Sequence, residues 1–130
     1  MTLPTLRQTL LIDAASAALF VAACLGFTQA LAVLTGLPPT IVAVAGWICV
    51  PSALLFAHQA YRPSRGLLSL VVAGNLAWVI ASLAVWLTHF AALTPVGHAV
   101  VIAQAVAVEA LLVLEWRGLK ASRAEQAAIA

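Results

Sequence analysis

Four polar side chains that could take up a proton or hold a ligand stand within long apolar stretches of this sequence. They are Asp13, His58, Asn75 and Glu109, and Asn75 is the only asparagine in the chain. Groups of this kind are costly in hydrocarbon surroundings, so they usually face the interior of a helix bundle and mark a site. Glu109 is the strongest candidate for a proton-exchanging group, because an enclosed carboxyl group can both hold and release a proton.

Other familiar chemistries find no support in the sequence. It contains no phosphate-binding loop, HExxH motif, nucleophile elbow or paired redox cysteines. Cys24 and Cys49 lie in apolar runs and are expected to be small buried side chains. His89 and His98 flank a loop without an acid or cysteine nearby, which is a weak pattern for a metal. We therefore predict no enzyme activity, no metal and no cofactor.

The composition indicates a membrane protein. The 130 residues are 65% hydrophobic and 8% charged, whereas soluble domains carry about 25% charged residues. A chain this small and this apolar could not cover its surface with polar groups in water. The formal net charge of +2 is too small to indicate nucleic acid as a partner. The lipid bilayer is the expected surrounding.

Four apolar runs are long enough to cross the hydrocarbon core, which takes about 20 helical residues. They cover residues of about 10–34, 40–61, 66–88 and 95–116, followed by a short tail over 117–130. We predict an all-α fold over 1–130, a single transmembrane domain built as a four-helix bundle. Because all connections are short, neighbouring helices should run antiparallel, up and down.

Turn and cap residues agree with these boundaries. Gly36 stands where a helix C-cap belongs, and Ser64 can cap the third span. Thr94 followed by Pro95 is typical of a helix start, and Gly118 is expected to end the fourth helix.

The positive charges favour one orientation. The first and third connections contain no Lys or Arg, so every basic residue falls on one side of a four-span chain. These residues are Arg7, Arg62, Arg65, Arg117, Lys120 and Arg123. The positive-inside rule then predicts that both termini are cytoplasmic. The compact, alanine-rich sequence favours a bacterial inner membrane.

This orientation gives each polar residue a depth. At 1.5 Å per residue, Asp13, His58, Asn75 and Glu109 fall within roughly 5 to 14 Å of the cytoplasmic boundary. We therefore predict one polar layer, in which Asn75 bonds a carboxyl group from a neighbouring helix. Gln104 is deeper, near mid-membrane, and belongs to the edge of this cluster. Glu115, beside Trp116 and Arg117, is expected to be a boundary residue. The cluster could equally be structural, holding the helices in register.

Small residues suggest how helices could meet. In lipid, association depends on close packing of small side chains. The first span has an i, i+4 row made of Ala14, Ala18, Ala22, Gly26 and Ala30. We expect this row to be a helix-packing seam or a face for self-association, in a homo-oligomer or a larger membrane complex.

Two functions remain open at this level. For want of a positive signal for transport or catalysis, the favoured one is a non-catalytic accessory, assembly or scaffold component. The alternative is a proton-coupled transporter or channel for a small solute, acting as a homo-oligomer with Glu109 as the titrating residue. A cavity of transport size that touches Glu109 would favour the alternative.

Overall fold

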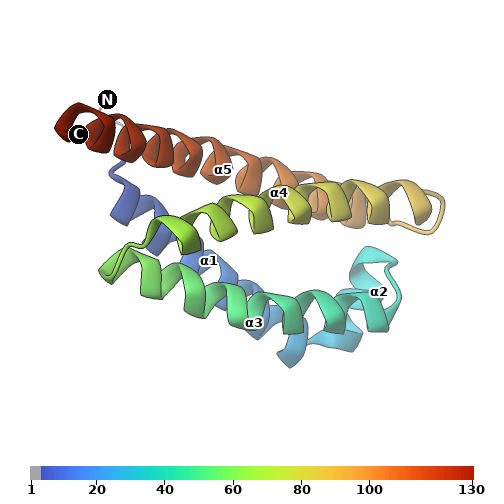
Figure 1. Cartoon of the computed structure of the whole chain (residues 1–130). Helices are drawn as coiled ribbons and strands as arrows, with labels where there is room; N and C mark the ends of the chain where they lie inside the picture. Colours follow the sequence, from blue (N-terminus) through green and yellow to red (C-terminus); the bar gives the residue numbers. More distant parts are fainter. Residues whose placement is uncertain (1–3) are drawn as a thin grey trace.

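The computed structural model describes residues 4–130, and this part of the chain is all-helical (Figure 1). Five helices follow one another: α1 (Leu6–Gly26), α2 (Thr28–Thr35), α3 (Pro39–Tyr61), α4 (Arg65–Thr88) and α5 (Pro95–Ile129).

Four of these helices could cross a membrane by length and composition. α1, α3, α4 and α5 have 21, 23, 24 and 35 residues, with mean hydropathies of 1.9 to 2.1 in their most apolar windows. Large apolar side chains point outward from each of them, such as Leu19, Leu54, Leu87 and Val106. In water such a surface would be unfavourable, whereas hydrocarbon tails solvate it.

Several helix ends follow the predicted cap residues. Gly36 ends α2 in the left-handed region, at φ 79°, where glycine has no steric penalty. Thr94 caps α5, because its hydroxyl accepts a hydrogen bond from the Gly97 N–H. Ser64 is the N-cap residue of α4, although its side chain makes no capping bond. At the chain's start, Thr5 and Gln8 form a reciprocal capping box.

The first predicted span, 10–34, is not one continuous helix. Phe27, at φ −130° and ψ 34°, separates α1 from α2. The break follows Gly26, a poor helix former. The Thr28 hydroxyl donates to the Cys24 carbonyl at 2.6 Å, which satisfies part of the interrupted backbone ladder.

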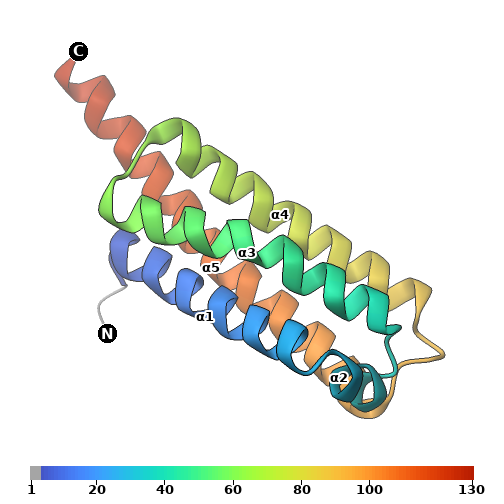
Figure 2. The ribbon, with the colours of Figure 1, turned by 90° about the horizontal axis from the view of Figure 1, so that it is seen from below.

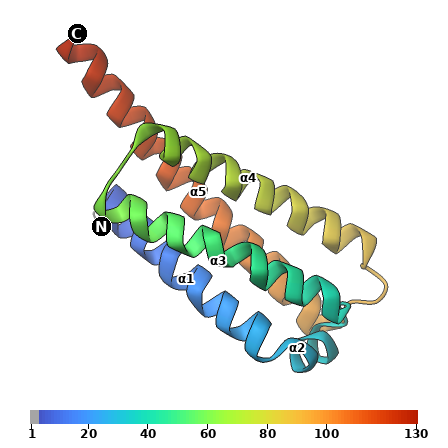
Figure 3. The same ribbon diagram turned by 60° about the horizontal axis from the view of Figure 1, so that its bottom comes forward.

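The fourth helix is longer than predicted. α5 continues through Gly118 to Ile129, because the residues that follow are mostly good helix formers and one interior glycine costs only about 1 kcal/mol. Gly118 has a packing role instead of ending the helix: a Cβ atom there would lie 2.8 Å from Leu6 Cδ1 of α1. The last turns of α5 project beyond the other helices (Figure 3).

The four long helices pack in two layers. α1 lies along α3, and α4 lies along α5 (Figure 1). Gly46 lets α3 approach α1 closely, since a Cβ there would lie 2.9 Å from Cys24 Cβ. The start of α1, the α3–α4 connection and the last third of α5 lie toward the same end of the molecule (Figure 2). The layers meet there in the main apolar core, which includes Leu10, Leu68, Val71 and Leu119.

Candidate functional site

Asn75 connects two buried carboxyl groups from different helices. Its amide nitrogen donates to Asp13 Oδ2 at 2.9 Å and to Glu115 Oε2 at 2.8 Å. Asp13 is 4%, Asn75 5% and Glu115 0% exposed. α1, α4 and α5 therefore each contribute one polar residue to a three-residue cluster, which we call the Asp13–Asn75–Glu115 cluster.

Helical spacing places all three side chains on inward faces. Asp13 is buried on α1 with Leu10 and Ala17, three and four residues away. Asn75 follows Leu68 and Val71 on α4 at the same kind of spacing. Residues three or four apart share one face of a helix. The apolar core that joins the two layers thus encloses the cluster from several sides.

The cluster has more acceptors than donors. Two carboxyl groups offer four oxygen atoms, while the Asn75 amide group has two N–H bonds to give. Glu115 Oε1 is buried and has no hydrogen-bond partner. Both bonded carboxyl oxygens contact the same nitrogen, so they cannot be more than about 6 Å apart. Two negative charges at that separation repel each other strongly in apolar surroundings.

Basic side chains near this end of the molecule have other contacts. The Arg7 guanidinium lies 5.0 Å from the centre of the Tyr61 ring, and Lys120 Nζ lies 5.5 Å from that of Trp116. Arg65 donates to the Ser122 carbonyl at 3.3 Å. Within residues 4–130, Asn75 is the side chain that donates hydrogen bonds to the two carboxyl groups. The missing donors must come from a proton, water or a bound cation.

Glu109 and His58 do not join this cluster, contrary to the predicted polar layer. Both are exposed on the outer surface of their helices. Glu109 and Glu115 are six residues apart, which corresponds to about 240° around an α-helix. They therefore face different sides of α5. Glu115 takes the place predicted for Glu109, because α5 turns the face that carries Glu115, and not the one that carries Glu109, toward Asn75 of α4.

Gln59, next to His58, has a role that the sequence did not indicate. Its side chain is 1% exposed. Oε1 accepts from the Ser64 N–H at 2.8 Å and Nε2 donates to the Arg62 carbonyl at 3.4 Å. Gln59 thus fixes the connection between α3 and α4.

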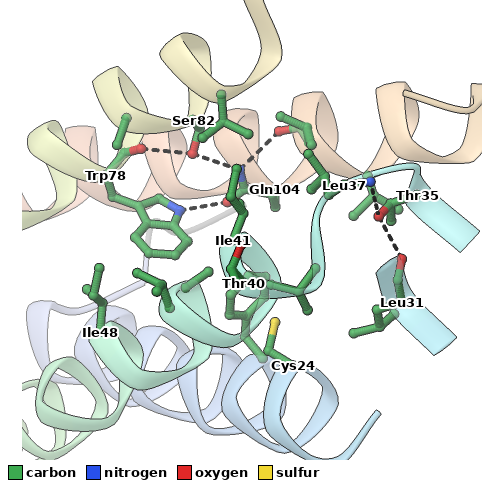
Figure 4. A pocket seen from close by; sticks show the side chains of 18 residues that line it. Cys24, Leu31, Thr35, Leu37, Thr40, Ile41, Ile48, Trp78, Ser82 and Gln104 are labelled. Carbon is green, nitrogen blue, oxygen red and sulfur yellow. Dashed lines mark hydrogen bonds between the residues drawn. The ribbon is translucent and has the colours of Figure 1, made fainter. Parts of the chain in front are cut away.

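Gln104 belongs to a second polar group, formed between α4 and α5. Its Oε1 accepts from Trp78 Nε1 at 2.7 Å, and its Nε2 donates to Ser82 Oγ at 2.9 Å and to the Val101 carbonyl at 3.1 Å (Figure 4). The Trp78 ring also makes an edge-to-face contact with Phe20 of α1, with centroids 5.6 Å apart. This group fixes the Trp78 ring between the two layers.

Two cavities adjoin these polar groups. The larger, of about 820 Å³, has Asp13 and Asn75 on its wall, together with residues of α1, α3, α4 and α5. The smaller, of about 420 Å³, includes Thr40, Leu37 and Ser82 (Figure 4). Trp78 and Gln104 line both cavities. The larger cavity therefore reaches from the Asp13–Asn75–Glu115 cluster to the Trp78–Gln104 pair.

The small-residue row predicted for the first span is divided by the break at Phe27, which leaves Ala30 on α2 and the other members on α1, and it faces away from the other helices for most of its length. Ala14 is half-buried, whereas Ala18, Ala22, Gly26 and Ala30 are exposed. A Cβ atom at Gly26 would meet nothing within 4 Å. Inside one chain the row is therefore not a packing seam, because the contact of α1 with α3 uses another face.

The remaining candidates for metal chemistry are engaged locally or lie apart. His98 Nδ1 accepts from Trp86 Nε1 at 3.0 Å, and His89 lies at the end of α4. Cys24 and Cys49 are buried free thiols. No set of three or more His, Cys, Asp or Glu side chains suited to a metal occurs among residues 4–130.

Comparison of the chain with models of known protein families, with curated proteins and with solved structures gives no match. The Asp13–Asn75–Glu115 cluster and its cavity are accordingly the features of this chain that bear on its function.

Proposed function

We propose that this chain is a proton-coupled carrier of a small solute, in which Asp13 and Glu115 exchange the proton. In this proposal α1, α3, α4 and α5 cross a bacterial inner membrane as an antiparallel four-helix bundle. The basic residues at the start of α1, around the α3–α4 connection and on the last turns of α5 favour a cytoplasmic location for both termini.

The observation that carries the proposal is a buried carboxyl pair with too few donors beside a cavity. A purely structural cluster should be closed and fully hydrogen-bonded, since an unpaired buried polar atom is costly. Glu115 Oε1 lacks a partner, and Asp13 and Asn75 line a cavity. A proton supplies the missing donor and removes one of two like charges.

In this proposal Asp13 and Glu115 are the titrating residues, in place of Glu109. Glu109 is exposed and is absent from the cavity wall, so its protonation would have no direct effect on an enclosed solute. Asp13 lies on the wall and is linked through Asn75 to Glu115. Protonation of either carboxyl group would change the charge that a solute in the cavity experiences.

Infrared difference spectroscopy of the purified protein tests proton exchange. A pH change should produce a carboxylic C=O band in the wild-type protein. The band should be lost or shifted in Asp13→Asn and Glu115→Gln, and it should persist in Glu109→Gln, which removes an exposed acid from the same helix. A wild-type spectrum without a band that depends on Asp13 or Glu115 would contradict the carrier proposal.

A second candidate, a non-catalytic accessory or assembly component, is supported by the outward row of small residues on α1. Ala18, Ala22 and Gly26 are exposed on α1, and small residues let helices approach closely in lipid. In this case the row is the contact with a second copy or another membrane protein. Ala22→Leu should then abolish assembly while leaving the infrared carboxyl band unchanged.

A further inference from the structure

We propose that the larger cavity binds a lipophilic monovalent cation of the organic ammonium or phosphonium class. The charge would lie beside Asp13 and Asn75, and the apolar body would extend toward Trp78. This inference rests on the proton-exchanging function proposed above and names the chemical class of its solute.

The dimensions of the cavity suit a small organic molecule. Its volume of about 820 Å³ lies within the range of roughly 300 to 1,000 Å³ that is usual for ligand pockets. It lies between the α1–α3 and α4–α5 layers, with wall residues from all four helices. A solute there would contact both layers at once.

The wall is almost entirely apolar, which excludes sugars and other strongly polar solutes. Ile48, Phe56 and Leu111 are among its side chains. The hydroxyl groups of Ser16 and Ser52 donate to carbonyl groups of their own helices. Such a wall requires an apolar ligand body, because a polar one would lose its hydrogen bonds to water without replacement.

Because Asp13 is an acid on the cavity wall, the polar part of the ligand should carry a positive charge. Glu115, which is not on the wall, shares the Asn75 amide with Asp13. An anion would be repelled by this pair. Trp78 and Phe20, also on the wall, offer aromatic surface that attracts cations.

Within residues 4–130, no basic side chain occupies the place beside Asp13 that the cation would take. The other titratable group on the wall is the Cys49 thiol. Elsewhere on the four helices, Cys24 is a buried thiol, Glu115 is buried against Asn75, and His98 is half-buried and accepts from Trp86. The other charged and titratable side chains are exposed, and Arg7, Arg65 and Lys120 among them have the contacts described above. They are Arg7 on α1, His58 and Tyr61 on α3, Arg65 on α4, and Glu109, Arg117, Lys120, Arg123 and Glu125 on α5.

Proton and cation therefore share one site. With two protons the carboxyl pair is neutral, and the loss of one leaves a single negative charge in apolar surroundings. A monovalent cation restores neutrality, so its binding releases up to one proton to the solvent. Because the two compete, the affinity for the cation should fall as the pH is lowered, by up to tenfold per pH unit.

Binding of tetraphenylphosphonium to the purified full chain tests the inference, with tetraphenylborate as an anion of nearly the same shape. Equilibrium dialysis against matched empty micelles should show saturable binding of the cation and none of the anion. Binding in a weak buffer should release protons. Equal binding of both ions, or cation binding without any pH dependence, would overturn the inference.

Variants then locate the site. Asp13→Asn should weaken cation binding by on the order of tenfold to a hundredfold. Glu115→Gln should have a smaller effect in the same direction, since Glu115 is not on the cavity wall but shares the Asn75 amide with Asp13. Glu109→Gln should bind like the wild-type protein. Undiminished binding by a folded Asp13→Asn protein contradicts the inference.

The infrared experiment separates this inference from the function on which it rests. A carboxyl band that depends on Asp13 and Glu115, without binding of tetraphenylphosphonium, refutes the lipophilic cation and leaves proton exchange standing. Absence of the band refutes both. The comparison of the two probe ions uses only the wild-type chain and so does not depend on how well any variant folds.

Discussion

At the scale of single residues, Asn75 resolves a conflict between two acids. Asp13 and Glu115 are buried close together, and each accepts one N–H of the same amide. No other residue type of this size offers two N–H donors without adding a charge, because Asp offers only acceptors and Ser has one donor. An apolar side chain at position 75 would leave two buried carboxyl groups facing each other.

We expect Asn75→Ala to destabilise the protein by about 1–3 kcal/mol, since it removes both hydrogen bonds and leaves their acceptors unsatisfied. The midpoint of thermal unfolding in detergent measures the effect. Leu76→Ala is the matched control, because Leu76 is the next residue on α4 and is 50% exposed. Equal loss of stability in the two variants would show that the bonds of Asn75 contribute nothing.

At the scale of the helices, the sequence was sufficient to predict several helix boundaries, but others could not be predicted from it. Caps such as Gly36 and Thr94 depend on local chemistry, which a short stretch of sequence contains. The break at Phe27 and the continuation through Gly118 depend on small propensity differences and on contacts with distant residues. A single sequence does not reveal such contacts.

The type of the candidate site was predictable, but two predicted members, His58 and Glu109, are exposed, and Gln104 belongs to a second polar group. Asp13 and Asn75 were recognised because polar side chains are costly in apolar spans, and the structure brings them together. Glu115 was assigned to the membrane boundary because Trp116 and Arg117 follow it. Choosing between Glu109 and Glu115 requires the rotation of α5 about its axis, which its hydrophobic pattern does not fix because it is apolar on nearly all sides.

The close contact between the end of α2 and the start of α5 can be tested by adding a side chain at Gly97. Gly97 packs directly against the end of α2, and a Cβ there would overlap the backbone carbonyl of Thr35. We expect Gly97→Ala to destabilise the protein by about 1–3 kcal/mol, because backbone atoms cannot move aside as a flexible side chain can.

Gly66 provides the control for that variant. It also lies in the first turn of its helix, but nothing lies within 4 Å of its Cβ position. Gly66→Ala should therefore leave the unfolding midpoint unchanged or raise it slightly, since alanine favours the helix by up to about 1 kcal/mol. A Gly97→Ala protein as stable as Gly66→Ala would contradict the close approach of α2 to α5.

At the scale of the whole molecule, charge and length distinguish the two ends. The basic side chains and the projecting last turns of α5 are at one end, and the apolar 89–94 connection is at the other (Figure 2). α5 is about 52 Å long at 1.5 Å per residue, which exceeds a hydrocarbon core of about 30 Å. The basic end of α5 should consequently extend into the aqueous phase, which is the cytoplasm in the orientation proposed above.

Single cysteines test this orientation in intact bacterial cells that express the chain. With Cys24 and Cys49 replaced by alanine, Ala91→Cys should react with a maleimide that cannot cross the inner membrane. Ala127→Cys should react only after the cells are opened, since positively charged flanks are retained in the cytoplasm. Both positions are exposed, so burial does not limit either reaction. Labelling of Ala127→Cys in intact cells would place the basic end outside. It would also place the Asp13–Asn75–Glu115 cluster of the proposed carrier near the outer face, because Glu115 is two residues from Arg117 and therefore close to that end.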